Sequence, residues 1–212
     1  MVVDNLQHIE GPIDSSRRPI KSRQSGWAKK LTILLLAWKV KANTVSWASM
    51  LFSTVGLVGF SMAGGYIPWW LGMLIGILAI QGRLICNLLD GMVAEANNEK
   101  SPVGKIMNEV PDRYSDIVLL VGAGVATNEI WLGWMAACIA VLTAYIRSFG
   151  AEMSGRQDFV GLMAKPQRMF YLSLGALCAI IYPNALLIAL YLIALGSVLT
   201  CLQRLKSMNK PL

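Results

Sequence analysis

The chain has 212 residues, of which 55% are hydrophobic and only 15% are charged. Soluble domains carry about 25% charged residues, so this composition excludes an ordinary soluble protein and predicts one compact integral membrane domain. The formal net charge is +7, and the basic N-terminal segment leads directly into membrane-spanning patterns. Anionic membrane lipid is therefore the predicted partner, and nucleic acid is not.

The N-terminal part divides into a polar tail and an amphipathic helix. Residues 1–23 are polar and irregular, and we expect a disordered cytoplasmic tail there. Residues 24–40 carry large apolar side chains spaced as on one face of a helix, with lysines flanking them. This pattern predicts an interfacial helix lying on the membrane, and a short transmembrane span is the alternative. The apolar face consists of Trp27, Leu31, Leu34, Leu35 and Trp38.

Six apolar segments then follow, and several approach the ~20 residues that a helix needs to cross a bilayer. They lie near 43–63, 69–94, 103–126, 129–153, 164–181 and 184–204. The turns on one side, at 64–65, 128 and 182–184, contain no Lys or Arg, whereas the other side is basic.

The positive-inside rule therefore predicts that both termini and the two longer loops are cytoplasmic. The predicted fold is an all-α integral membrane protein with six transmembrane helices and an N-terminal interfacial amphipathic helix. It comprises one membrane domain, 24–206, and a cytoplasmic tail, 207–212. We expect a multi-pass protein of the inner (plasma) membrane with its active site on the cytoplasmic side.

Polar side chains gather where the second predicted span ends and the third begins. Asn87 and Asp90 are spaced i, i+3, and Asn108, Asp112 and Asp116 form one stripe that rises ~12 Å along a helix. Ionisable groups in membrane segments usually mark function. Oxygen ligands alone suit Mg²⁺ or Mn²⁺, so these five residues are predicted metal ligands. The alternative is that the carboxylates only pair with nearby basic residues, namely Arg83, Lys105 and Arg113.

The stretch 87–112 resembles the signature of the CDP-alcohol phosphatidyltransferase family, D-x-x-D-G-x-x-A-R-x(8)-G-x-x-x-D-x-x-x-D. The matching residues are Asp90, Gly91, Ala94, Gly104 and Asp112. The six spans and the interfacial helix also agree with that family, so the resemblance covers most of residues 24–206. An alignment that used Asp112 and Asp116 as the last two acids would lose Gly104, and the first alignment is preferred.

Three positions depart from the signature. Asn87 and Asn108 stand where the first and third Asp are expected, and Glu95 stands where Arg is expected. Each Asn keeps a carbonyl oxygen but loses a negative charge, which weakens metal binding. Glu95, Glu109 and Asp116 are candidates to restore that charge.

The resemblance implies transfer of a phosphatidyl group from a CDP-activated lipid to an alcohol, with release of CMP. It implies Mg²⁺ or Mn²⁺ as cofactor and Asp112 as the catalytic base for the acceptor hydroxyl. Gly91, Ala94 and Gly104 would let the cytidine nucleotide approach the backbone. CDP-diacylglycerol or a related CDP-alcohol is the implied donor, the acceptor alcohol stays open, and a homodimer is expected from the family.

Basic residues near the fourth and fifth predicted spans are candidates for phosphate binding. Arg147 closes the fourth span, and Lys165 and Arg168 open the fifth, with Pro166 in its first turn. Exposed N–H groups and basic side chains together favour an anion, and the resemblance implies a phosphorylated acceptor or the lipid diphosphate. The alternative is that these basic residues only reflect membrane topology, because cytoplasmic loops are basic in any case.

Two other function classes stay open from the sequence. A small transporter would also place polar groups within the bilayer, but it would more often show interrupted helices and internal repeats. A catalytically weakened family member could instead act as a membrane binding or scaffold subunit, given the residues at 87, 95 and 108. Release of CMP by the purified protein would separate both from the enzyme.

Overall fold

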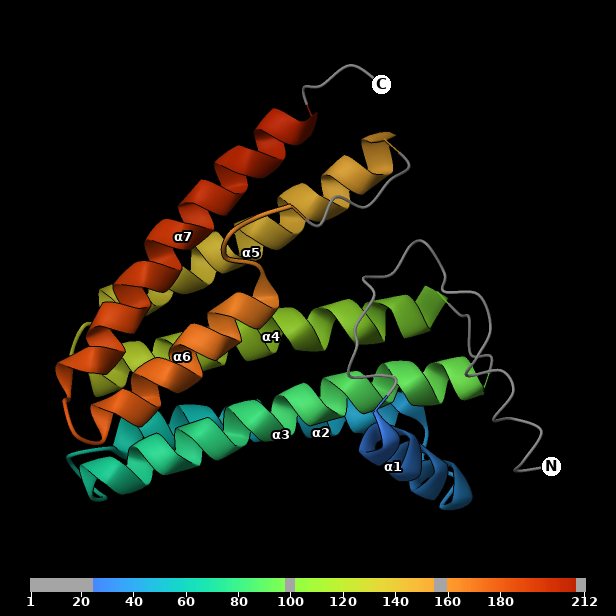
Figure 1. Ribbon diagram of the computed structural model, residues 1–212, viewed down its shortest axis with the longest axis horizontal. Coiled ribbons are helices and arrows are strands. Elements are labelled where there is room, and N and C mark those ends of the chain that lie inside the picture. The colour runs from blue at the N-terminus through green and yellow to red at the C-terminus, as the bar shows by residue number, and fades with distance from the viewer. Residues whose placement is uncertain (1–24, 98–101, 155–159, 209–212) are drawn as a thin grey trace. The chain divides into compact units, whose positions relative to one another are not determined.

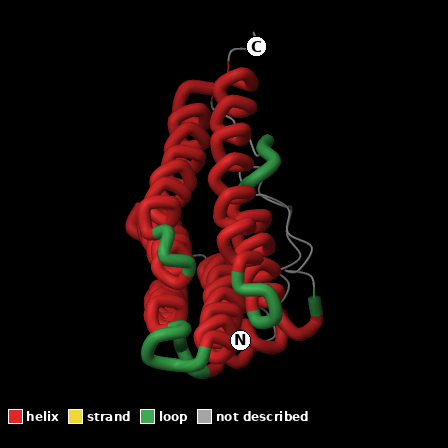
Figure 2. Tube along the Cα trace, turned by 90° about the vertical axis from the view of Figure 1, so that its left-hand side faces the viewer, coloured by secondary structure: helices red, strands yellow, loops and turns green. Residues whose placement is uncertain are grey.

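The computed structural model describes residues 25–97, 102–154 and 160–208, which form seven α-helices (Figure 1). Short loops join consecutive helices within each described stretch (Figure 2). The all-α prediction is confirmed for this part of the chain, whereas the tail predicted over residues 1–23 lies outside the described residues. The helices are α1 (Gly26–Ala37), α2 (Ala42–Met62), α3 (Trp69–Ala96), α4 (Pro102–Ala126), α5 (Ile130–Ser154), α6 (Lys165–Ala179) and α7 (Asn184–Met208).

The helices end where the sequence places turns. Gly64, between α2 and α3, has φ +77°, and Asn128, between α4 and α5, has φ +57°. This left-handed backbone suits glycine, and asparagine adopts it more easily than most other residues. Pro166 lies in the first turn of α6, where its missing N–H breaks no helical hydrogen bond.

Four helices are long and apolar enough to cross a membrane, namely α2, α3, α5 and α7. The helix α4 has 25 residues, but its first half is strongly polar. The helix α6 has only 15 residues, which span ~22 Å against a hydrocarbon core of ~30 Å. The structure thus supports a multi-pass membrane protein with four candidate spans, and the count of six stays a prediction.

The chain divides into two compact units, and the helices α2, α3 and α4 each contribute residues to both. The first unit comprises Met1–Phe52 and Gln81–Ser115, and the second comprises Ser53–Ile80 and Asp116–Leu212. The described part of the first unit contains α1, the beginning of α2, the end of α3 and the beginning of α4. The other parts of these three long helices belong to the second unit with α5, α6 and α7. The predicted single domain over 24–206 is not tested by this division.

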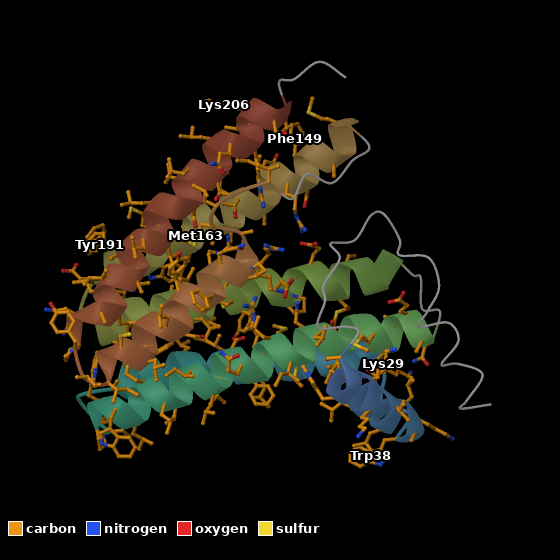
Figure 3. All side chains as sticks on the ribbon, in the orientation of Figure 1. Lys29, Trp38, Phe149, Met163, Tyr191 and Lys206 are labelled. Carbon is orange, nitrogen blue, oxygen red and sulfur yellow. The ribbon has the colours of Figure 1, made fainter. Side chains whose placement is uncertain are left out.

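In the first unit, α1 packs on α3 through Ala28, Thr32 and Leu35, the last of which contacts the cluster of Val45, Cys86 and Leu89, and it exposes Trp27, Leu31 and Leu34. Ala28 lies in a buried cluster with Leu88 and Met92, and the Thr32 hydroxyl lies 3.7 Å from the Met92 sulfur. The opposite face is exposed, and Trp38, at the end of α1, is 69% accessible (Figure 3). This division of faces is the one expected of an interfacial helix, and its contact with lipid stays a prediction.

In the second unit, α7 packs along α5 and α6, and α4 approaches α5 at two glycines. A Cβ atom added to Gly133 would lie 2.8 Å from the carbonyl oxygen of Leu120 and 3.0 Å from the Cα of Gly124. Both neighbours are backbone atoms, which cannot turn aside as a side chain can. Gly124 of α4 and Gly133 of α5 therefore determine how closely these helices pack.

Gly133→Ala is expected to lower the free energy of unfolding by about 1–3 kcal/mol, because the added methyl group overpacks a contact between two backbones. The measurement is thermal or denaturant unfolding of the purified protein in detergent. Gly65→Ala is the matched control, because a Cβ there meets nothing within 4 Å. Equal stability of the two variants would contradict the close approach of α4 and α5.

Candidate functional site

The first unit holds a buried polar cluster contributed by three helices. Asp90 of α3 and Asp112 of α4 are 5% and 7% exposed, and Arg83 of α3 and Ser46 of α2 are 0% and 3% exposed. Arg83, Asp90 and Asp112 are the buried charged side chains among the described residues of this unit. Three segments that are distant in sequence thus contribute buried polar groups to this unit, and we call these four residues the acidic cluster.

A hydroxyl group holds the first acid of the cluster. The Ser46 Oγ donates a hydrogen bond of 2.9 Å to Oδ2 of Asp90. A hydrogen bond to a buried carboxylate is charge-assisted and restricts its rotamer. Ser46 was not singled out from the sequence, so this residue was missed as part of the site. Its signal was a small hydroxyl residue at the start of an apolar span.

A buried arginine contacts the second acid. The Arg83 Nη2 donates a hydrogen bond of 3.2 Å to the main-chain oxygen of Asp112, and it lies 3.7 Å from Oδ1 of the same residue. Arg83 and Asp112 thus lie within ion-pair distance, as the alternative expected for this pair. For Arg113 the partner is Glu109, at 2.7 Å, one turn earlier on α4.

The remaining predicted ligands of this region lie on α3 and α4. Asn87 is half-buried and falls between Arg83 and Asp90 on the same face of α3, as the spacing i, i+4, i+7 requires. Asn108 lies in α4, and its side chain is outside the described residues. The small residues of the signature, Gly91, Ala94 and Gly104, are half-buried.

The donor chemistry of the acidic cluster fits a hard divalent cation. Two carboxylates and the Asn87 amide supply oxygen, which Mg²⁺ and Mn²⁺ prefer. Within the described residues, no group of three or more His, Cys, Asp or Glu side chains could hold a metal ion. Asn87 and Asn108 occupy two positions where the signature has Asp.

Two of the three residues proposed to restore charge have arginine partners of their own. Glu109 pairs with Arg113, and Asp116 pairs with Arg168 inside the second unit. Glu95 is exposed near the end of α3. These contacts do not support a transfer of the missing negative charge to Glu109 or Asp116.

The second unit contains a buried ion pair. The Arg168 Nη2 lies 2.7 Å from Oδ2 of Asp116, and both residues are 1% exposed. The Arg168 Nη1 also donates to the Thr143 hydroxyl at 3.2 Å and to the main-chain oxygen of Met163 at 3.0 Å (Met163 is labelled in Figure 3). Arg168 thus links α4, α5 and the segment before α6, and its predicted contact with phosphate stays a prediction.

A second buried arginine, which the sequence did not single out, holds the same segment. The Arg204 Nε donates to the main-chain oxygen of Val160 at 2.9 Å, and its Nη1 donates to the main-chain oxygen of Thr143. The Thr200 hydroxyl accepts a hydrogen bond from the Met163 N–H at 2.8 Å. The predicted phosphate ligands Arg147 and Lys165 are half-buried in this unit, and their roles are not tested.

Sequence comparison identifies relatives that are named phosphatidylinositol phosphate synthase and archaetidylinositol phosphate synthase. No family model matches the chain. The chain is 28% identical over 161 residues to the phosphatidylinositol phosphate synthase of Mycobacterium marinum, covering 68% of this chain and 67% of that protein. It is 27% identical over 144 residues to the archaetidylinositol phosphate synthase of Pyrococcus horikoshii, covering 66% and 72%.

The fold agrees with crystal structures of a related synthase. The phosphatidylinositol phosphate synthase of Mycobacterium tuberculosis with CDP-DAG bound superposes with a TM-score of 0.69 at 21% identity, over 85% of this chain and 92% of that one. Its complex with manganese and citrate gives 0.70 at 20% identity, over 85% and 88%. At this level of sequence identity, the structural similarity shows a shared fold and no more. The chain is thus similar in sequence to phosphatidylinositol phosphate and archaetidylinositol phosphate synthases and shares the fold of one such synthase, in agreement with the resemblance to the CDP-alcohol phosphatidyltransferase family that the motif ending at Asp112 carries.

Proposed function

We propose that the chain transfers a phosphatidyl group, a substituted phosphate, from a CDP-activated lipid to an alcohol acceptor and releases CMP, as a step of phospholipid biosynthesis. The observation that carries the proposal is the acidic cluster. Asp90 and Asp112, the two acids that the chain keeps from the signature, are both buried in one unit with polar partners. The related synthase crystallised with CDP-DAG bound supports CDP-diacylglycerol or a related CDP-alcohol as donor.

The acidic cluster would hold Mg²⁺ or Mn²⁺ through the carboxylates of Asp90 and Asp112 and the amide oxygens of Asn87 and Asn108. The relative crystallised with manganese supports this choice of ion. The bound ion supplies positive charge that stabilises the diphosphate and the departing CMP. Asp116, which the sequence included among the ligands, is placed outside this set because its carboxylate pairs with Arg168.

Asp112 is proposed as the general base. It would accept the proton of the acceptor hydroxyl while the acceptor oxygen forms a bond to the lipid-side phosphorus and the bond from that phosphorus to CMP breaks. Ser46 keeps Asp90 oriented, and Arg83 holds the main chain at Asp112. The small side chains of Gly91, Ala94 and Gly104 would let the nucleotide approach the backbone.

The basic residues Arg147, Lys165 and Arg168 are proposed to increase the positive potential that attracts phosphate. Among them, Arg168 is fully buried and already donates to three acceptors. Its contribution is therefore better described as positioning the segment before α6, while Arg147 and Lys165 remain the candidates for direct contact.

The experiment that tests the proposal is release of CMP from labelled CDP-diacylglycerol by the purified protein with a panel of alcohols and either Mg²⁺ or Mn²⁺. The rival hypothesis is a weakened family member that acts as a scaffold, and the small number of clustered acids in the described residues favours it. Folded protein that binds the donor but releases no CMP with any alcohol would support that rival. A transporter is less consistent, because the four candidate spans are continuous helices.

The same proposal places the chain in the inner (plasma) membrane with six spans, both termini and the acidic cluster on the cytoplasmic side, and a homodimer as the assembly. In this placement α4 and α6 join the four apolar helices as spans. The polar half of α4 would then lie at the cytoplasmic mouth, where water and a metal ion solvate its charges.

Topology can be checked with single cysteines on a background that lacks the four native ones. A membrane-impermeant maleimide applied to intact cells is expected to label Asn128→Cys, between α4 and α5, and to leave Asn97→Cys, at the end of α3, unlabelled. Both positions are exposed, so both should react after permeabilisation, which serves as the control. The reverse pattern in intact cells would contradict a cytoplasmic acidic cluster.

A further inference from the structure

Arg83 is a fully buried arginine that the proposed reaction does not use directly. It is 0% exposed and lies on the same face of α3 as Asn87 and Asp90. Burying a guanidinium is costly unless it is paired and hydrogen-bonded. Its presence beside acids that are proposed to bind a cation therefore needs a physical reason.

The geometry separates two effects of this arginine. At 3.2 Å, Nη2 makes a hydrogen bond to the main-chain oxygen of Asp112 and so fixes the backbone of α4 relative to the end of α3. At 3.7 Å from Oδ1, the same atom is too distant for a hydrogen bond to the carboxylate but close enough for a strong Coulomb attraction. The charge of Arg83 therefore partly neutralises the Asp112 carboxylate, although its hydrogen bond goes to the main-chain oxygen and not to the carboxylate.

The acidic cluster has little net negative charge for a site that is proposed to bind a divalent cation. Its buried charged side chains among the described residues are Arg83, Asp90 and Asp112, which sum to −1. Asn87, one turn from Arg83, is neutral where the signature carries an acid. A fixed positive charge and a missing negative charge act in the same direction, and both weaken the attraction for a cation.

We propose that Arg83 is a positioning residue that holds Asp112 in place for the reaction and, by its charge, lowers the divalent-metal affinity of the acidic cluster. The inference rests on the proposed function, because it concerns the ion that the proposed reaction requires. Once a divalent ion is bound, the same three side chains and the ion sum to +1. The site then presents positive charge to an anionic diphosphate, which a fully acidic cluster would repel.

The test is Mn²⁺ binding to the purified full-length protein in nanodiscs, followed by electron paramagnetic resonance. Arg83→Gln is expected to bind Mn²⁺ about tenfold more tightly or better, because it removes a positive charge close to the ion. Its CMP release at saturating Mn²⁺ is expected to fall about tenfold, because Asp112 loses its support. Arg83→Lys, the control that keeps the charge, should bind Mn²⁺ within about threefold of the native chain. Tighter binding with slower transfer is a result that a merely structural arginine would not produce.

Unchanged or weaker Mn²⁺ binding by folded Arg83→Gln would overturn the inference. If that variant does not fold, Asn87→Asp changes the same charge balance in the same direction and is expected to tighten Mn²⁺ binding about tenfold, and an unchanged affinity there would overturn it equally. A native chain that binds Mn²⁺ but releases no CMP refutes the proposed function alone, whereas a native chain that binds no Mn²⁺ refutes both.

Discussion

Asp90→Asn is expected to lower metal-dependent release of CMP by about 100-fold or more while the protein still folds. Partners that only orient a metal ligand typically change affinity or activity by about 10–100-fold, so loss of a ligand's own charge should cost at least that much. Asp90 is buried and already hydrogen-bonded to Ser46, and the amide keeps the size and one carbonyl oxygen of the carboxylate. The measurement is initial CMP release against Mg²⁺ and Mn²⁺ concentration.

Two further variants make this result specific. Glu95→Gln, the same change of carboxylate to amide on the exposed end of α3, should leave the metal dependence within about twofold. Ser46→Ala should give an intermediate loss of about tenfold, because it removes the hydrogen bond that orients Asp90 but not the carboxylate itself. Full activity of Asp90→Asn would refute the assignment of Asp90 as a metal ligand.

Asp116→Ala is expected to lower the free energy of unfolding by about 3–5 kcal/mol, which is the usual cost of leaving one partner of a buried ion pair without the other. The lost partner is Arg168, whose guanidinium lies 2.7 Å from the carboxylate at 1% exposure. The remaining contacts of Arg168 with Thr143 and Met163 are to neutral oxygens and do not offset its charge. The measurement is unfolding of the purified protein in detergent.

The control for this prediction is a pair of the same chemistry nearer the surface. Glu109→Ala removes the partner of Arg113 at the same distance of 2.7 Å, but the Glu109 side chain is 45% exposed, so the loss should be at most about 1 kcal/mol. The double change Asp116→Asn with Arg168→Met leaves no buried charge at this pair and should be more stable than Asp116→Ala. A loss below about 1 kcal/mol for Asp116→Ala would show that the ion pair does not hold the second unit together.

The pattern of apolar residues was enough to predict where the helices run. The expected segments near 69–94 and 184–204 correspond to α3 and α7, and the turn at Asn128 lies where α4 ends. Helices are local structures, so spacing along the chain and the residues that end them report directly on their bounds. The number of spans was harder to predict, because the charges in α4 and the short length of α6 weaken the hydropathy signal of two of the six predicted spans.

The sequence by itself determined which helix faces are polar and which family the motif resembles. Spacing alone put Asp112 and Asp116 on one stripe of α4 and made them equivalent as ligands. Only the tertiary structure separated them, because their partners come from elsewhere in the chain. Arg83 lies 29 residues before Asp112, and Arg168 lies 52 residues after Asp116. Ser46, 44 residues before Asp90, became part of the site for the same reason. A periodic pattern records which face of a helix a side chain occupies, but the charge that it meets there depends on which helix packs against that face.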